Sequence, residues 1–164
     1  MGGNLIDYPW EVATPTADLT TSKLLFNSVI STPGARFITM DAKNFYLNTP
    51  MPRPEYMRLK LDLIPEEIIE HYKLREKAKD GWVYVIIEMG MYGLPQAGLL
   101  ANQLLEKRLN EAGYFQCQYT PGLWRHVWRP VTFTLVVDDF GVKFEGIQHA
   151  KHLKEELEKY YEMS

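Results

Sequence analysis

The strongest pattern along the chain is helical. Between residues 99 and 113, apolar side chains fall on one face of an α-helix: Leu99, Leu100, Leu104, Leu105 and Leu109. Gly113 follows them, and glycine readily adopts the left-handed conformation that often ends a helix. We therefore predict a helix that buries a leucine-rich face and ends at Gly113.

Three weaker helical patterns lie elsewhere. Residues 20–31 (TTSKLLFNSVIS) place apolar side chains on one face and precede Pro33 and Gly34, which end helices. Residues 65–81 begin with proline and two glutamates and end with Asp-Gly, so they predict a surface helix. A last helix is predicted from Ile147 almost to Ser164, with an apolar stripe formed by Ile147, Ala150, Leu153, Leu157 and Tyr160.

Alternating or β-branched residues predict strands between these helices. Residues 36–41 (RFITMD) alternate, and residues 55–61 (EYMRLKL) alternate with one wet face. Residues 82–89 (WVYVIIEM) predict a buried strand because of their β-branched content. Residues 131–137 and 140–145 flank two aspartates and predict an antiparallel hairpin.

These elements predict one α+β domain over residues 21–164. Residues 1–20, rich in Gly, Pro and Thr, predict an irregular N-terminal arm, and residues 114–130 predict an aromatic-rich connection. A chain of 164 residues fits a single domain, and its hydrophobic content of 46% argues against disorder.

Composition narrows the functional classes. The chain has 18 Lys and Arg against 21 Asp and Glu, a net charge of −3, which argues against an autonomous nucleic-acid-binding module. Its single cysteine, Cys117, has no partner for an internal disulfide. The sequence shows neither a signal peptide nor an apolar run of the ~20 residues that span a bilayer. We therefore expect an intracellular, non-secreted protein with no membrane partner.

Two adjacent carboxylates, Asp138 and Asp139, interrupt the apolar stretch FTLVVDDFGVKF. Aspartate is common in tight turns, so one interpretation is purely structural. The triplet DFG at residues 139–141 also matches the magnesium-binding triplet of protein kinases, but the chain has neither the glycine-rich loop nor the His-Arg-Asp sequence of that family. Two like charges side by side raise the cost of ionising each other, and a divalent cation removes that cost.

A third carboxylate completes a candidate metal site. Asp41 ends the strand predicted over residues 36–41, and the backbone amides of the following AKNFYLN are suited to an anionic ligand. Mg²⁺ prefers oxygen ligands, and two such ions about 3.5–4 Å apart promote in-line phosphoryl transfer. We therefore predict that Asp41, Asp138 and Asp139 converge and hold two Mg²⁺ ions.

Three blocks of the sequence resemble a known family. MDAKNFYLNTPM, MYGLPQAG and LVVDDFGV stand in the order, and at about the spacing, of conserved blocks of reverse transcriptases. The resemblance is closest to those of LTR retrotransposons of the copia and gypsy kinds, and it extends from about Thr20 to the end. It implies a polymerase palm-like antiparallel sheet backed by helices, with partial fingers, which acts as an RNA-directed DNA polymerase on a primed RNA or DNA template.

The resemblance implies roles for single residues. Asp41 resembles the first catalytic, metal-binding carboxylate of the palm, and Asp138 and Asp139 resemble the acidic pair of its catalytic hairpin. Val136 stands where the family usually has the tyrosine of Tyr-x-Asp-Asp.

The same resemblance implies a dNTP site. Tyr46 stands where the family has the aromatic side chain that excludes a 2′-OH, and the backbone amides of Asn44 and Phe45 are expected to face the triphosphate. Gln96 matches the glutamine that contacts the nucleotide near its 3′-OH. From the residues alone, Tyr46 also fits a core position, and Gln96 also fits an exposed first turn of a helix after Pro95.

Two further groups have structural and functional interpretations. His149 and His152 share a helix face, but they lack a third metal ligand, so we interpret them as surface residues. Trp124 and Trp128, with their neighbouring arginines, are typical of a stacking surface for nucleic acid, and also of ordinary packing, which we favour.

The family's thumb, primer grip, connection and RNase H domain have no counterpart in these 164 residues, and the block after Gln96 lacks the Pro-Arg-x-Trp of copia elements. We therefore expect the remainder of a retrotransposon polyprotein (thumb, RNase H, integrase) as a partner, in a cytoplasmic virus-like particle or the nucleus, and no activity from the chain alone. The alternative is a catalytically inactive palm remnant that acts only as a folded or interaction domain.

Overall fold

The structure is a computed structural model that describes residue 6, residues 8–9 and residues 11–164. Its helices are α1 (Leu19–Ile30), α2 (Glu66–His71), α3 (Leu74–Lys77), α4 (Ala97–Glu111) and α5 (Ile147–Glu158). Its strands are β1 (Ala35–Lys43), β2 (Pro50–Lys60), β3 (Trp82–Met89), β4 (Tyr114–Gln116), β5 (Leu123–His126), β6 (Val131–Val136), β7 (Asp139–Glu145) and β8 (Glu162–Met163). Short 3₁₀ helices η2 (Tyr46–Asn48) and η3 (Leu61–Leu63) flank β2.

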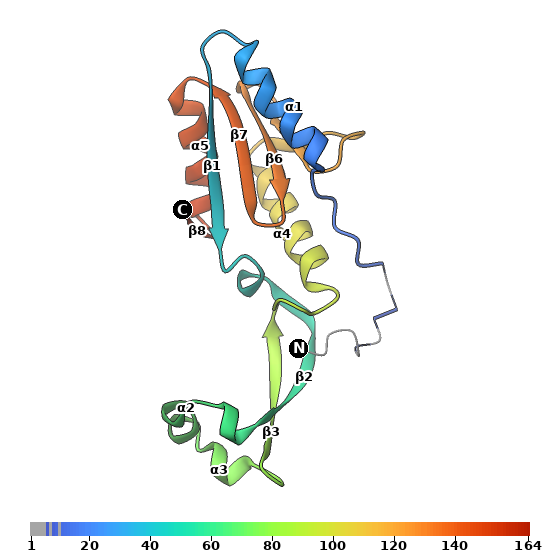
Figure 1. Cartoon of the computed structure of the whole chain (residues 1–164), viewed down its shortest axis with the longest axis vertical. Coiled ribbons are helices and arrows are strands. Elements are labelled where there is room, and N and C mark those ends of the chain that lie inside the picture. The colour runs from blue at the N-terminus through green and yellow to red at the C-terminus, as the bar shows by residue number, and fades with distance from the viewer. Residues whose placement is uncertain (1–5, 7, 10) are drawn as a thin grey trace.

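The strands form two antiparallel sheets. Six strands pair in the order β4-β5-β6-β7-β1-β8, and β2 pairs only with β3 in a two-stranded ribbon. Figure 1 shows this ribbon extending away from the six-stranded sheet, with α2 and α3 at its far end. The predicted α+β architecture, an antiparallel sheet backed by helices, is confirmed.

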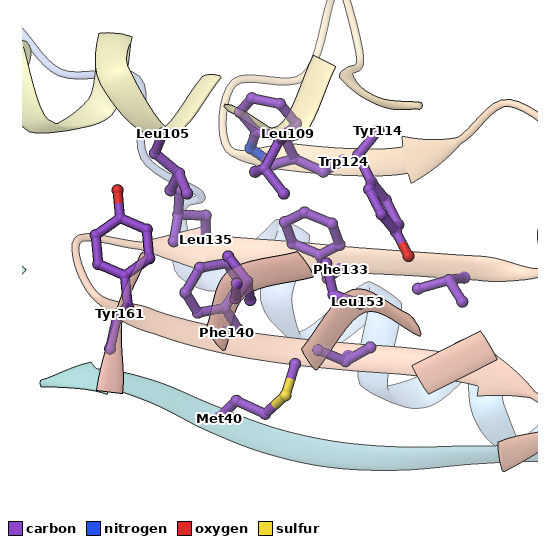
Figure 2. Packing of buried hydrophobic residues seen from close by; sticks show 14 of the residues in the cluster. Met40, Leu105, Leu109, Tyr114, Trp124, Phe133, Leu135, Phe140, Leu153 and Tyr161 are labelled. Atoms are coloured by element: carbon purple, nitrogen blue, oxygen red, sulfur yellow. The ribbon is translucent and has the colours of Figure 1, made fainter. Parts of the chain in front are cut away.

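The main core lies between the six-stranded sheet and two helices, α4 and α5. On the sheet side, six residues of β6 and β7 are at most 1% exposed: Val131, Phe133, Leu135, Phe140, Val142 and Phe144. Leucines of α4 and α5 cover them, and Figure 2 shows Leu105, Leu109 and Leu153 around Phe133 and Phe140. The predicted leucine-rich face of α4 is confirmed only in part: Leu105 and Leu109 pack on the sheet, whereas Leu100 packs on a second, smaller cluster. Gly113 follows the helix with a left-handed φ of 86°.

Helix α1 covers part of the opposite face of the sheet. The ring of Phe26 meets the edge of Phe37 of β1, with the ring centroids 5.1 Å apart. The Lys143 ammonium of β7 donates to the Ser28 carbonyl, the Ser28 hydroxyl and the Thr32 hydroxyl at 2.7–3.2 Å. A cation at the last turn of a helix satisfies carbonyls that have no intrahelical partner, so Lys143 both caps α1 and fixes it to the sheet.

The N-terminal arm is shorter than predicted. Helix α1 begins at Leu19 because Asp18 caps it, its carboxylate accepting from the Thr21 amide at 2.6 Å. Just before the cap, the Ala17 amide donates to the Leu135 carbonyl, and a side chain at Gly122 would lie 1.9 Å from the Ala17 nitrogen. The arm therefore passes so close to position 122 that only glycine fits there. Residues 1–5, 7 and 10 of the predicted arm lie outside the described residues.

The predicted helix over residues 65–81 is wrong. The chain forms α2 and α3 instead, separated by Lys73 in the left-handed conformation (φ 51°). The break lets Arg75 return to Glu66 at 2.6 Å, whereas residues nine apart in one helix lie about 13.5 Å apart along its axis. Asp80-Gly81, predicted as a helix stop, has positive φ at both residues and forms a tight turn into β3.

Three other predictions need correction. The predicted connection over residues 114–130 contains two strands: β4 pairs with β5, and β5 pairs with β6. The last helix ends at Glu158, and β8 then pairs with the end of β1. Strand β3 is not buried as predicted, because β2 and β3 form an isolated ribbon in which Tyr84 and Ile86 are exposed.

A cluster of histidines joins α5 to the sheet edge. His126 of β5 accepts two backbone hydrogen bonds at Nδ1, from Trp128 and Arg129. His152 of α5 contacts the Tyr114 hydroxyl at 3.0 Å, and its nearest acidic partner is Glu156 at 3.9 Å. Burial and then the Arg129 charge lower the pKa of both His126 and His152. The predicted surface position of His152 is therefore wrong, since it lies half-buried in this cluster.

This cluster predicts acid sensitivity. A histidine with a lowered folded pKa adds stability that is fully present above its ordinary pKa of about 6.5 and is lost as the pH falls through the folded value. We expect the free energy of unfolding to decline below pH 7 by up to about 1.4 kcal/mol per pH unit for each histidine. Urea unfolding between pH 7.5 and 5 measures this slope. His152→Gln should flatten it and the exposed His71→Gln should not; equal slopes in both variants would contradict the assignment.

Candidate active site

Strands β1 and β7 bring together two of the three carboxylates that were predicted to converge. Asp41 of β1 and Asp139 of β7 are direct partners in the antiparallel register. Directly opposed residues have Cβ atoms about 4.5–5.5 Å apart and side chains on the same face of the sheet. Their neighbours Met40 and Phe140 point into the core, so the two carboxylates point away from it, to the face on which α1 lies.

The third carboxylate lies in the turn that joins β6 to β7. Val136 pairs with Asp139, so Val137 and Asp138 form a two-residue turn. The predicted hairpin is confirmed, but its turn begins one residue earlier than predicted and Asp139 belongs to β7. The Asp138 carbonyl accepts from the Ala42 amide at 3.1 Å, which holds the turn against β1. Val137 has a φ of 59°, a value that is costly for a β-branched residue. Such local strain is common at functional sites, and here it sits between the core strand and the acidic pair.

The charges of the neighbouring carboxylates act on Asp139. Partial burial, then the charges of Asp138 and Asp41, raise the pKa of Asp139. Although the Asp139 side chain is exposed on one side, the sheet on its other side removes part of its hydration. A raised carboxylate pKa means that the folded chain disfavours the third negative charge, and a bound cation would reverse this preference.

Two tyrosines stand beside the carboxylates. The Tyr92 hydroxyl donates to Asp138 Oδ2 at 2.8 Å, and its ring contacts that of Tyr46 with the centroids 4.4 Å apart. The hydrogen bond to Asp138, with a smaller contribution from burial, raises the pKa of Tyr92 to about 12. Burial and the Asp138 charge also raise the pKa of Tyr46, which is half-buried. Tyr46 therefore lies near the acidic pair, while one side of its ring packs on Phe45.

The backbone between β1 and η2 is suited to an anion. Asn44 has a left-handed φ of 54°, and Phe45 follows in the right-handed helical region (φ −46°, ψ −50°). Successive residues of opposite hand turn their backbone amides toward one point, a geometry that binds phosphates in other proteins. The Phe45 side chain is buried in the core and the Asn44 side chain is exposed, so only their backbones can serve the predicted role.

Gln96 lies in the interior and not in an exposed first turn. Its side chain is 1% exposed, and its Nε2 donates to the buried Glu55 carboxylate of β2 at 3.0 Å. Its Oε1 has no hydrogen-bond partner among the described residues. It lines a cavity of about 200 Å³ together with Met51, Arg53 and Leu100. The contact between Gln96 and a nucleotide stays a prediction, and Glu55 is a buried charge that sequence reasoning missed.

The donor set fits Mg²⁺ in chemistry. Among the residues that the structure describes, no group of three or more His, Cys, Asp and Glu side chains is arranged to hold a metal ion. Mg²⁺, however, often takes only one or two protein carboxylates and completes its shell with water and substrate phosphates. Asp41 and Asp139, opposed on one face, offer such a pair of oxygen ligands. Two-ion binding by all three carboxylates stays a prediction.

The β2–β3 ribbon presents a second candidate surface. One face carries three cross-strand pairs that mix aromatic, aliphatic and basic side chains: Tyr56 with Ile86, Arg58 with Tyr84, and Lys60 with Trp82. The Arg58 guanidinium lies 4.1 Å from the centre of the Trp82 ring. Tyr56 and Tyr84 are about 70% exposed. A hollow of about 550 Å³ at the far end of this ribbon is lined by none of the three predicted metal-binding aspartates, so it is separate from the acidic site.

The predicted tryptophan pair divides into core and surface. Trp124 is fully buried and stacks on Phe133 with the rings nearly parallel, so it packs, as favoured above. Trp128 is exposed, and the Arg129 guanidinium lies 4.2 Å from its ring. Sequence reasoning missed Tyr92 altogether: it stands in the quoted block MYGLPQAG, but a tyrosine in a loop has no periodicity that would assign it a partner.

No helix in the described part of the chain is long and apolar enough to cross a membrane. Comparisons of the chain with protein-family models, with curated proteins and with solved structures find no match.

Proposed function

We propose that the chain is a reverse transcriptase palm with partial fingers, of the LTR retrotransposon kind, that transfers nucleotides from dNTP to a primer on an RNA or DNA template. The observation that carries the proposal is the pairing of Asp41 with Asp139 on one face, with Asp138 in the adjoining turn. The order of the three sequence blocks supports it, because the first and third blocks lie on neighbouring strands.

The chain's own residues have separate tasks in this proposal. Asp41, Asp138 and Asp139 would hold Mg²⁺ through carboxylate oxygens. When bound, Mg²⁺ would lower the pKa of the primer hydroxyl and offset negative charge on the leaving pyrophosphate. The amides of Asn44 and Phe45 hold the triphosphate, so the nucleotide sugar lies over the exposed side of Tyr46.

The ribbon face supports a nucleic-acid partner despite the net charge of −3. Aromatic rings stack on bases regardless of sequence, and basic side chains pair with phosphates. Arg58 and Lys60 lie among Tyr56, Trp82 and Tyr84 on one side of an extended ribbon. We propose that this face contacts the template strand.

Nucleotide binding tests the dNTP site in the chain as it stands. We expect dATP to compete better than ATP for a fluorescent dATP analogue in the presence of Mg²⁺, because the Tyr46 ring leaves no room for a 2′-OH. Tyr46→Ala should reduce this preference about tenfold, an energy of about 1.4 kcal/mol. Tyr46→Phe, which keeps the ring, is the matched control. Equal competition by dATP and ATP in the unaltered chain would contradict a role of Tyr46 in sugar selection and leave it only a packing role.

A second function, a non-catalytic remnant, is favoured by one observation: the Gln96 amide is already bonded to Glu55 inside the protein. Primer extension separates the two functions when the chain is fused to a polymerase thumb. The enzyme proposal expects extension that Asp139→Asn abolishes. The remnant expects none, with nucleotide binding also absent.

A further inference from the structure

We infer that Tyr92 is a positioning residue that orients the Asp138 carboxylate for cation binding, an inference that rests on the function proposed above. Its hydroxyl donates to Asp138 Oδ2 at 2.8 Å. Within the described chain this is the hydrogen bond that fixes the Asp138 side chain, since the turn's other contact, from Ala42, goes to the Asp138 backbone carbonyl. Without Tyr92, a carboxylate in an exposed turn would be free to rotate.

The protein holds Tyr92 in place from two sides. Its ring lies against Tyr46 at 4.4 Å between the centroids. The loop that carries it follows β3 directly, and the Gly90 amide at the start of that loop donates to the Thr49 carbonyl at 2.7 Å. A side chain at position 90 would lie 2.7 Å from the Tyr46 carbonyl oxygen, so the loop runs tightly against η2. The backbone of this loop is therefore held in a position that places the Tyr92 hydroxyl beside Asp138.

The hydrogen bond leaves room for a cation. A carboxylate has two oxygens and about four lone-pair directions, so Oδ2 can accept from Tyr92 while Oδ1 faces a metal ion. Carboxylates that bind metals are commonly held by such outer partners, and removing one typically costs 10–100-fold in metal affinity. Tyr92 also contacts both Asp138, which would face the cation, and Tyr46, which would face the nucleotide sugar. One residue therefore positions both side chains.

Binding of Mn²⁺ alone tests this inference without catalysis. Free Mn²⁺ is measured by electron paramagnetic resonance during titration of the unaltered chain, Tyr92→Phe and the control Tyr119→Phe, whose side chain is exposed and lies outside the proposed sites. We expect Tyr92→Phe to weaken binding at least tenfold and Tyr119→Phe to leave it unchanged. Urea unfolding should show that Tyr92→Phe keeps the fold, since it removes only an exposed hydroxyl.

A coupled variant separates positioning from general stability. In an Asp138→Asn chain, Tyr92→Phe should have no further effect on Mn²⁺ affinity, because the carboxylate it orients is absent. Unchanged or tighter binding by Tyr92→Phe alone overturns the inference, and tighter binding would identify the hydroxyl as a competitor of the cation. Failure of the unaltered chain to bind Mn²⁺ at all overturns the proposed metal site itself, and the inference with it.

Discussion

Replacing Asp139 with asparagine is expected to weaken Mn²⁺ binding by more than about 100-fold, beyond what the loss of an outer-shell partner usually costs. Asp139 and Asp41 supply opposed carboxylates on one face of the sheet, and an amide oxygen carries no charge to replace one of them. Asp41→Asn should have the same effect. Isothermal titration with MnCl₂ measures both affinities.

The same substitution should not destabilise the fold, and this distinguishes loss of a ligand from loss of structure. The folded pKa of Asp139 is raised, so its ionised form opposes folding at neutral pH, and this penalty disappears as the pH falls through the folded value. Asp139→Asn removes the penalty, so the metal-free chain should be equally or more stable in urea. Asp62→Asn, an exposed carboxylate in η3, serves as the control. Mn²⁺ affinity that survives in both Asp139→Asn and Asp41→Asn would refute the cation site.

Phe140→Ala should cost about 3–5 kcal/mol of unfolding free energy, the usual range for removing a fully buried aromatic side chain. Phe140 is 1% exposed, contacts Phe133 at 5.6 Å between ring centroids and lies under both α4 and α5. A domain is commonly stable by only 5–15 kcal/mol, so this single change removes a large share of the total.

Urea unfolding at pH 7.5 measures the loss. Phe140→Leu keeps most of the volume and should cost about 1 kcal/mol, which makes it the matched control. A loss below about 1 kcal/mol for Phe140→Ala would mean that the core closes around the missing ring and that β7 is not fixed by packing. The position of Asp139, one residue before Phe140, would then need another explanation.

Long periodic elements could be predicted from the sequence because their own side chains specify them. The leucines of α4 recur over several turns, and Gly113 marks the end of the pattern. The β6–β7 hairpin has apolar residues on both sides of an acidic pair, and the register places Asp139 opposite Asp41. Asp41 could be chosen in advance because it follows an apolar stretch of the sequence, although β1 continues two residues beyond it to Lys43.

Short elements could not be predicted because distant partners specify them. Strands β4 and β5 have only three and four residues. Their aromatic side chains indicate burial in the core, but they do not indicate whether the backbone is a strand or a loop. The break at Lys73 is accompanied by a contact between Arg75 and Glu66, nine residues apart, which no helical pattern predicts. The Tyr92–Asp138 and Gln96–Glu55 contacts join residues more than 40 positions apart, so no local pattern contains them.

Asp41 and Asp139 form one site only while both side chains lie on the same face of the sheet. The site therefore depends on the exact number of residues in β1 before Asp41. Side chains of a strand alternate between faces, so one residue inserted into β1 before Asp41 would turn that carboxylate into the core. The ribbon lies outside these strands, and residues added or removed near its far end leave the register of β1 and β7 untouched. Length variation in descendants of this chain should therefore accumulate at the ribbon, while β1 and β7 keep their lengths.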